Sequence, residues 1–145
     1  MKAIRTWVLL ADARRAHVMS YDVPSKRLVP VEGAEWIAEP PAEFSDEAGV
    51  MASRVGAGRP SISRPDPALQ AEIAFAKSIV GHLNKAREKG RFDKLVVAAA
   101  PHMLGVLRTY ITPELQAIIQ AEFDKDLTQS NPEKLMHSLA EVFPV

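Results

Sequence analysis

The side chains best suited to chemistry are a few carboxylates that an α/β fold could bring together. Asp12 follows the first apolar run, and Glu72 lies in a long predicted helix from which it could face Asp12. Two-metal nucleases hold their ions with several converging carboxylates, and a third ligand would be expected where the most apolar strand ends. Positions 98–101 read Ala-Ala-Ala-Pro there, and Asp93 lies at the opposite end of that strand. The set is incomplete, so we interpret Asp12 as a turn former and expect no nuclease activity.

A cationic segment lies within a stretch of about residues 39–67 that shows no convincing periodicity. Positions 48–65 contain three arginines and no acidic residue, whereas charges elsewhere are balanced. The spacing of the glycines does not match the phosphate-binding G-x-x-x-x-G-K-[ST] motif, which disfavours a nucleotide site. Arginines on a glycine-rich loop suit contact with RNA phosphates, and a solvated loop with scattered arginines is the alternative. The predicted RNA-binding residues are Arg54, Gly56, Gly58, Arg59 and Arg64.

A second candidate site consists of Asp12, His102 and Arg108. His102 directly follows the apolar strand at 95–100, and open α/β folds commonly bind ligands where such strands end. A solvent-facing or capping histidine is the alternative for His102. For Arg108 we favour a structural role, paired with an acidic strand face that carries Glu122, Asp124 and Asp126.

Other site chemistries find no support in the sequence. The chain has no cysteine, which excludes disulfides, thiolate zinc sites and cysteine nucleophiles. No two of the four histidines lie four residues apart, so we predict no metal site. No Gly-x-Ser-x-Gly elbow occurs. We therefore assign no catalytic residue and no cofactor.

Charge and hydropathy limit the possible partners and location. The chain has 18 basic and 18 acidic residues, so the whole molecule does not attract nucleic acid or membranes electrostatically. The apolar run before Asp12 is too short for a secretory signal, and no stretch is long enough to cross a membrane. We expect one cytoplasmic domain over residues 1–145, without membrane contact.

A long helix is predicted to follow the central loop. Asp66 suits the N-terminal cap, Pro67 the first helical position and Gly90 the end of the helix. Apolar residues recur at spacings of four and three, which predicts one stripe that packs on a sheet. The stripe residues are Leu69, Ile73, Ala76, Val80 and Leu83.

The remaining elements follow from hydrophobic patterning and turn residues. The strand at 95–100 lacks alternation, so we expect a central strand with both faces covered, flanked by helices. The segment 121–128 alternates and is interpreted as an outer strand, with a helix running on from Leu115 as the alternative. The predicted elements around the long helix are strands at 7–11, 15–21 and 27–31, the strand at 95–100, a helix at 101–108, the strand at 121–128, and helices starting at Thr112-Pro113 and spanning 132–142.

This β-β-β-α-β-α-β-α order predicts an α/β protein of ribonuclease H-like layout. In that layout a mixed five-stranded sheet carries helices packed on it. The proline at position 30 predicts that the third strand lies near an edge of the sheet.

Three segments, in this order, resemble the bacterial host-attachment protein family, required for attachment to host cells. They are Trp-Val-Leu-Leu-Ala-Asp at 7–12 with Arg-Ala-His-Val at 15–18, Pro-His-Met-Leu-Gly-Val-Leu-Arg at 101–108, and Asp-Lys-Asp-Leu-Thr at 124–128. The resemblance extends over nearly the whole chain and is weakest in the central loop. The family is also similar to the central domain of archaeal and eukaryotic class I peptide release factors and of Pelota, which implies the same ribonuclease H-like topology.

The resemblance implies a role in translation, with one departure. In the release factors the corresponding loop carries a Gly-Gly-Gln motif that promotes peptidyl-tRNA hydrolysis, whereas here positions 56–59 read Gly-Ala-Gly-Arg and the loop has no glutamine. We therefore expect a non-enzymatic, cytoplasmic protein that contacts the ribosome or tRNA and affects attachment indirectly. The alternatives are a hydrolase acting on RNA or a peptidyl-tRNA ester, and a homo-oligomeric, for example dimeric, interaction module.

Overall fold

The fold is built on one mixed five-stranded sheet, and a computed structural model describes it for residues 4–41 and 66–143. Three antiparallel strands open the chain: β1 (Thr6–Ala11), β2 (Arg15–Asp22) and β3 (Arg27–Ile37). Two further strands, β4 (Lys94–Ala99) and β5 (Ile119–Phe123), run parallel to β1, in the order β3-β2-β1-β4-β5. The α/β class and the mixed five-stranded sheet are confirmed.

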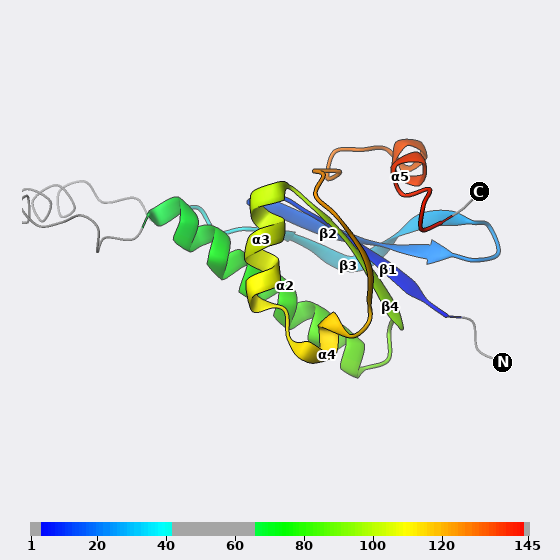
Figure 1. The fold of residues 1–145 in the computed structure, drawn as a ribbon, viewed down its shortest axis with the longest axis horizontal. Coiled ribbons are helices and arrows are strands. Elements are labelled where there is room, and N and C mark those ends of the chain that lie inside the picture. The colour runs from blue at the N-terminus through cyan, green and yellow to red at the C-terminus, as the bar shows by residue number, and fades with distance from the viewer. Residues whose placement is uncertain (1–3, 42–65, 144–145) are drawn as a thin grey trace, which may run out of the picture.

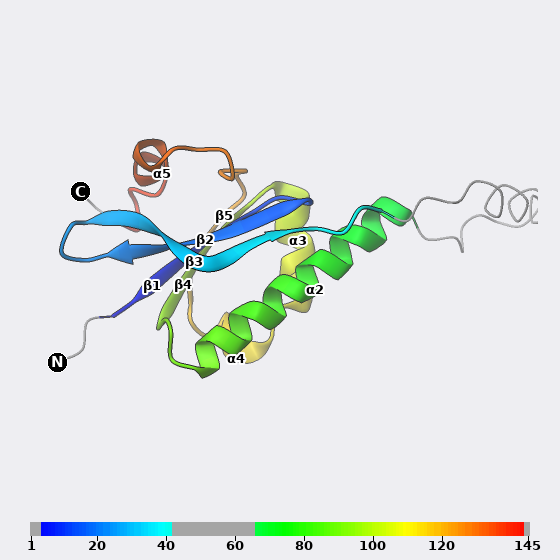
Figure 2. The same ribbon diagram turned by 180° about the vertical axis from the view of Figure 1, so that it is seen from behind.

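Helices cover both faces of this sheet (Figures 1 and 2). The larger core lies under α2 (Pro67–Glu88), α3 (Pro101–Tyr110) and α4 (Pro113–Gln116), and the smaller one under α5 (Pro132–Ser138). Along β1, Trp7 and Leu9 point into the larger core, while Val8 and Leu10 point into the smaller one. Because both faces are covered, β1 and β4 are apolar at every position after the first, which explains the missing alternation.

Helix α2 begins and ends as predicted. The Asp66 side chain accepts a hydrogen bond from the Ala68 backbone N–H, and Pro67 is the first helical residue. After the helix, Gly90 takes a φ of 71°, in the left-handed region that glycine adopts at low cost.

The predicted apolar stripe of α2 is wrong in its first turn. Leu69 is 38% exposed, whereas Glu72, three residues later, is only 8% exposed. Figure 2 shows that the first turn of α2 extends past the end of α3.

Strand β3 is longer than predicted. β3 continues to Ile37 because its pairing with β2 shifts register between His17 and Met19, and Gly33 adopts a φ of 80° beside the shift. Such a bulge interrupts the alternation that a sequence pattern can detect. As predicted from its proline, β3 lies at an edge of the sheet.

The outer strand predicted at 121–128 is displaced. β5 ends at Phe123, and the chain then leaves the sheet so that Leu127 reaches the core under α5. A helix running on from Leu115 is also wrong, since α4 ends at Gln116. The last helix is shorter than predicted and ends at Ser138, and Asn131 caps it through the Lys134 backbone N–H.

Candidate functional site

Two of the residues singled out from the sequence follow strands that end at the same edge of the sheet. β1 and β4 are parallel neighbours whose last residues, Ala11 and Ala99, are paired, and the Ala100 backbone N–H donates to the Ala11 carbonyl at 3.1 Å. Asp12 follows the first strand, and His102 lies in the first turn of the helix after the second. The carboxyl ends of parallel strands are the usual ligand-binding edge of α/β sheets.

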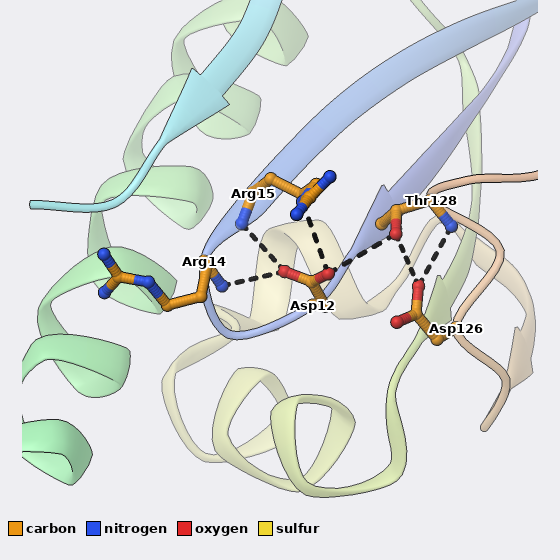
Figure 3. A network of polar contacts seen from close by, with 5 residues as sticks. All are labelled: Asp12, Arg14, Arg15, Asp126 and Thr128. Carbon is orange, nitrogen blue, oxygen red and sulfur yellow. Dashed lines mark hydrogen bonds and ion pairs between the residues drawn. The ribbon is translucent and has the colours of Figure 1, made fainter. Parts of the chain in front are cut away.

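The Asp12 carboxylate holds the turn between β1 and β2 (Figure 3). Its Oδ1 accepts hydrogen bonds from the backbone N–H groups of Arg14 and Arg15, both at 2.8 Å. Its Oδ2 lies 3.6 Å from Nε of Arg15. The predicted turn-forming role of Asp12 is confirmed.

Thr128, in the segment that follows β5, lies beside this turn (Figure 3). Thr128 Oγ1 lies 2.6 Å from Asp126 Oδ1 and 3.4 Å from Asp12 Oδ2. A hydroxyl has one proton, so Thr128 donates it across the shorter distance, to Asp126. Asp126 therefore accepts hydrogen bonds from Thr128, two residues later in the chain. It does not lie on a strand face with Glu122 as predicted.

The turn has a measurable role in stability. Replacing Asp12 with alanine removes the acceptor of two backbone N–H groups, so we expect the free energy of unfolding to fall by about 1–2 kcal/mol, as for a lost helix cap. Asp12→Asn keeps an acceptor oxygen and should stay within about 0.5 kcal/mol of wild type, because asparagine caps as well as aspartate. Urea unfolding at neutral pH measures both, and equal losses would show that charge, not turn geometry, is what Asp12 contributes.

His102 is held by a buried carboxylate. Its Nδ1 lies 2.9 and 3.0 Å from the two carboxylate oxygens of Glu72. The His102 side chain is 70% exposed, in line with the solvent-facing alternative, whereas Glu72 is buried. A carboxylate only accepts, so Nδ1 carries the proton and Nε2 remains as the second ring nitrogen. In neutral His102 the Nε2 atom is therefore an acceptor for a proton or a ligand.

The expectation that Glu72 could face Asp12 is wrong, since both its oxygens contact His102. The sequence predicts Glu72 only as a possible metal ligand, and its pairing with His102 is not predicted. A signal was present: Glu72 precedes Ala76, Ile79 and Leu83 at helical spacing, which places a carboxylate on the buried face of α2.

Arg108 lies away from this edge. It is six residues after His102 on α3, which corresponds to about 9 Å along the helix axis. Its Nε donates to Glu122 Oε1 of β5 at 2.8 Å, so the predicted structural pairing is confirmed for Glu122. It joins α3 to the outer strand.

The five predicted RNA-binding residues, Arg54, Gly56, Gly58, Arg59 and Arg64, lie outside the described residues. Within residues 4–41 and 66–143, no group of three or more histidine, aspartate or glutamate side chains is placed to hold a metal ion. In the same part of the chain, no helix has the length and apolarity needed to cross a membrane.

An open hollow of about 490 Å³ lies beside the Asp12 turn. It is lined by Arg14, Arg15, His17, Glu35 and Thr128, among others, so it offers groups of both charges. His17 and Glu35 are paired across β2 and β3. Burial lowers the pKa of His17 below its ordinary value of 6.5, and the charge of Glu35 opposes this shift in part.

This shift predicts a pH dependence of stability. Because the folded protein keeps His17 neutral to lower pH, the unfolded chain binds the proton first as pH falls below about 6.5. The contribution of His17 is complete above that pH and is lost as pH decreases toward its folded pKa. Urea unfolding at about pH 7.5, 6.5 and 5.5 should give a smaller decline for His17→Asn than for wild type. Equal declines would contradict the assignment.

The sequence of the chain is similar to those of other proteins. The sequence model of a family described as "Protein required for attachment to host cells" matches residues 7–139. The uncharacterized protein RP470 of Rickettsia prowazekii (strain Madrid E) is 36% identical over 58 residues, which are 39% of this chain and 39% of RP470. This match therefore spans about two fifths of that relative's length.

Among solved structures, the chain is similar to the type II variant of the Ppx/GppA phosphatase of Aquifex aeolicus, with a TM-score of 0.41 and 9% sequence identity. That similarity covers 83% of this chain and 36% of the phosphatase chain.

Proposed function

The chain belongs to the family of proteins required for attachment to host cells, and from this premise we propose that it acts on attachment indirectly, as a cytoplasmic binding protein without catalytic activity. The observation that supports the proposal is that the polar side chains near the carboxyl ends of β1 and β4 already have hydrogen-bond partners within the protein. Asp12 accepts from the backbone of its own turn, and Glu72 accepts from His102. These contacts stabilise the fold, and they favour a scaffold that presents a binding surface.

We assign this scaffold to the ribonuclease H-like layout and relate it to the central domain of peptide release factors and Pelota. The strand order β3-β2-β1-β4-β5, with antiparallel strands before parallel ones, supports the assignment. The relation to release factors rests on sequence resemblance.

The proposed partner is the ribosome or tRNA, contacted through the arginine segment at positions 48–65. The support is electrostatic: Arg54, Arg59 and Arg64 occur there without any acidic residue, in a chain of zero formal charge. RNA binding through phosphate contacts weakens steeply as salt is added.

Sedimentation of cell lysate through a sucrose gradient tests this partner. At about 50 mM salt we expect part of the protein to travel with ribosomes and to be released at about 200 mM salt. Replacing Arg54, Arg59 and Arg64 with glutamine should remove the ribosomal fraction. The matched control removes three charges elsewhere, with Arg27→Gln, Lys125→Gln and Lys134→Gln. Absence of wild-type protein from ribosomes at low salt would exclude the proposal.

The Glu72–His102 pair favours a second candidate, hydrolysis of RNA or of a peptidyl-tRNA ester. Neutral His102 presents Nε2 as an acceptor that could take a proton from an attacking water. Purified protein incubated with labelled RNA and with labelled peptidyl-tRNA would release product if this holds. Activity should then be lost in His102→Ala, and activity that survives both His102→Ala and Asp12→Asn would rule out this edge as the active site.

A further inference from the structure

A second hollow, of about 230 Å³, lies beside the C-terminal half of α2. Its lining includes Gly33, Trp36, His82, Lys85, Lys89 and Arg91. We refer to it as the cationic hollow. It lies at the opposite end of α2 from Asp66, where the segment containing the three arginines joins the helix, so it is independent of the function proposed above.

The charges around this hollow are of one sign. No carboxylate lines it, whereas Glu35 lines the hollow beside Asp12. In the part of the chain that the structure describes, no acidic side chain forms an ion pair with Lys85, Lys89 or Arg91. By contrast, Arg87, on the same helix, lies 3.8 Å from Glu88.

Lys85, Lys89 and Arg91 are solvent-exposed, so their mutual repulsion in the absence of an anion is weak but still unfavourable. Lys85 and Lys89 are four residues apart along the end of α2, a spacing at which like charges repel. Part of the arrangement has a structural explanation, since Lys85 complements the negative C-terminal end of the helix dipole and the Arg91 guanidinium lies 5.2 Å from the centre of the Trp7 ring. Lys89, the C-cap residue, is likewise placed to complement this helix end, but neither explanation accounts for the convergence of all three cations on one hollow.

Aromatic rings form the other wall. Trp36 stacks on His82 with ring centres 4.7 Å apart and an angle of 6° between the ring planes. Trp7 also lines the hollow, but it is buried and stacks on Phe92 at 4.5 Å, so Trp36 offers the aromatic surface that a ligand can reach. Rigid rings beside cations match a ligand that has both a charged group and an apolar or aromatic part, the combination found in nucleotides.

We propose that the cationic hollow binds the phosphate group of a phosphate ester, carried either by a free nucleotide or by an RNA strand. Its volume is below the roughly 300 Å³ at which pockets for drug-sized ligands begin, so it suits one phosphate with its neighbouring atoms. Lys85, Lys89 and Arg91 neutralise the phosphate, and the rest of the ligand lies over the aromatic wall.

Tryptophan fluorescence can report this binding directly, because Trp7 and Trp36 are the two tryptophans of the chain and both line the hollow. We would titrate the full-length protein with inorganic phosphate, adenosine monophosphate and a single-stranded RNA oligonucleotide at about 50 mM salt. For the tightest of these, Lys85→Gln/Lys89→Gln should weaken binding at least about tenfold and lower the slope of log affinity against log salt by about 2 for RNA.

Two further variants test whether the weaker binding is due to loss of the charges of Lys85 and Lys89. Lys125→Gln/Lys134→Gln removes the same charge from residues that do not line the hollow and should bind within about twofold of wild type, since salt screens exposed charges that do not contact the ligand. Lys85→Arg/Lys89→Arg keeps both charges and should also bind like wild type. Unchanged thermal midpoints would show that all variants are folded.

The three ligands distinguish the source of the phosphate. Tight binding of RNA alone identifies a strand, and comparable binding of adenosine monophosphate identifies a free nucleotide. Either result supports the hollow as a phosphate site when Lys85→Gln/Lys89→Gln weakens the binding. Binding of none of them by wild type, or equal weakening by both glutamine doubles, would overturn the proposal. RNA binding lost on removal of Arg54, Arg59 and Arg64, but kept without Lys85 and Lys89, would also overturn it while supporting the ribosome proposal.

Discussion

Replacing Leu83 with alanine is expected to lower the free energy of unfolding by about 2–5 kcal/mol, the largest effect that we predict for a single substitution. Leu83 is 2% exposed and lies in the core between α2 and the sheet. Alanine would leave a cavity among neighbours such as Ile79, which can relax only in part. Urea unfolding followed by circular dichroism would show the loss as a lower midpoint with an unchanged slope.

The matched control is Leu69→Ala on the same helix. The same atoms are removed, but Leu69 is 38% exposed, so we expect a loss below about 1 kcal/mol. Leu69 and Leu83 are equivalent in the predicted stripe, and only the structure separates them. Equal losses for the two variants would contradict the described packing of α2.

The second large effect concerns the pair at the carboxyl edge of the sheet. His102→Ala leaves the carboxylate of Glu72, which is 8% exposed, without the imidazole that contacts both its oxygens. A buried polar group that loses its partner costs about 1–3 kcal/mol, and we expect a loss of that size although His102 itself is largely exposed.

A double-mutant cycle separates this explanation from a loss of packing. In Glu72→Met/His102→Ala the buried charge is absent, so the double variant should be more stable than His102→Ala. The interaction energy of the two sites should reach at least about 0.5 kcal/mol. If the single losses simply add, the pair has no energetic role and the contact is incidental.

The two proposals concern different ends of the same long helix. The arginine segment joins α2 at Asp66, and the cationic hollow lies at the helix's C-terminal half. If both bind phosphates of one RNA, the ribosomal fraction in the gradient should decrease in Lys85→Gln/Lys89→Gln as well. If the hollow takes a free nucleotide, that fraction should be unaffected while fluorescence quenching is lost.

The elements could be predicted wherever their signals are local. Asp66, Pro67 and Gly90 mark the two ends of α2 because a cap, a first-turn proline and a left-handed glycine act within a few residues. Thr112 and Asn131 likewise cap the helices that follow them. The end of β5 could not be predicted, because it depends on contacts with residues that are distant in sequence. Alternation continues past Phe123, but pairing with β4 stops there and Leu127 is drawn into the other core.

The sequence by itself determined the order of strands and helices, the turn at Asp12 and the family resemblance, because each depends on residues that are neighbours along the chain. Only the tertiary structure decided which side chains meet across long separations. It paired Glu72 with His102, joined Arg108 to Glu122, and gathered Trp36, Lys85 and Arg91 around one hollow. These contacts depend on how α2 and α3 lie on the sheet, on where β5 pairs with β4 and on where β3 shifts register, and no local pattern encodes any of them.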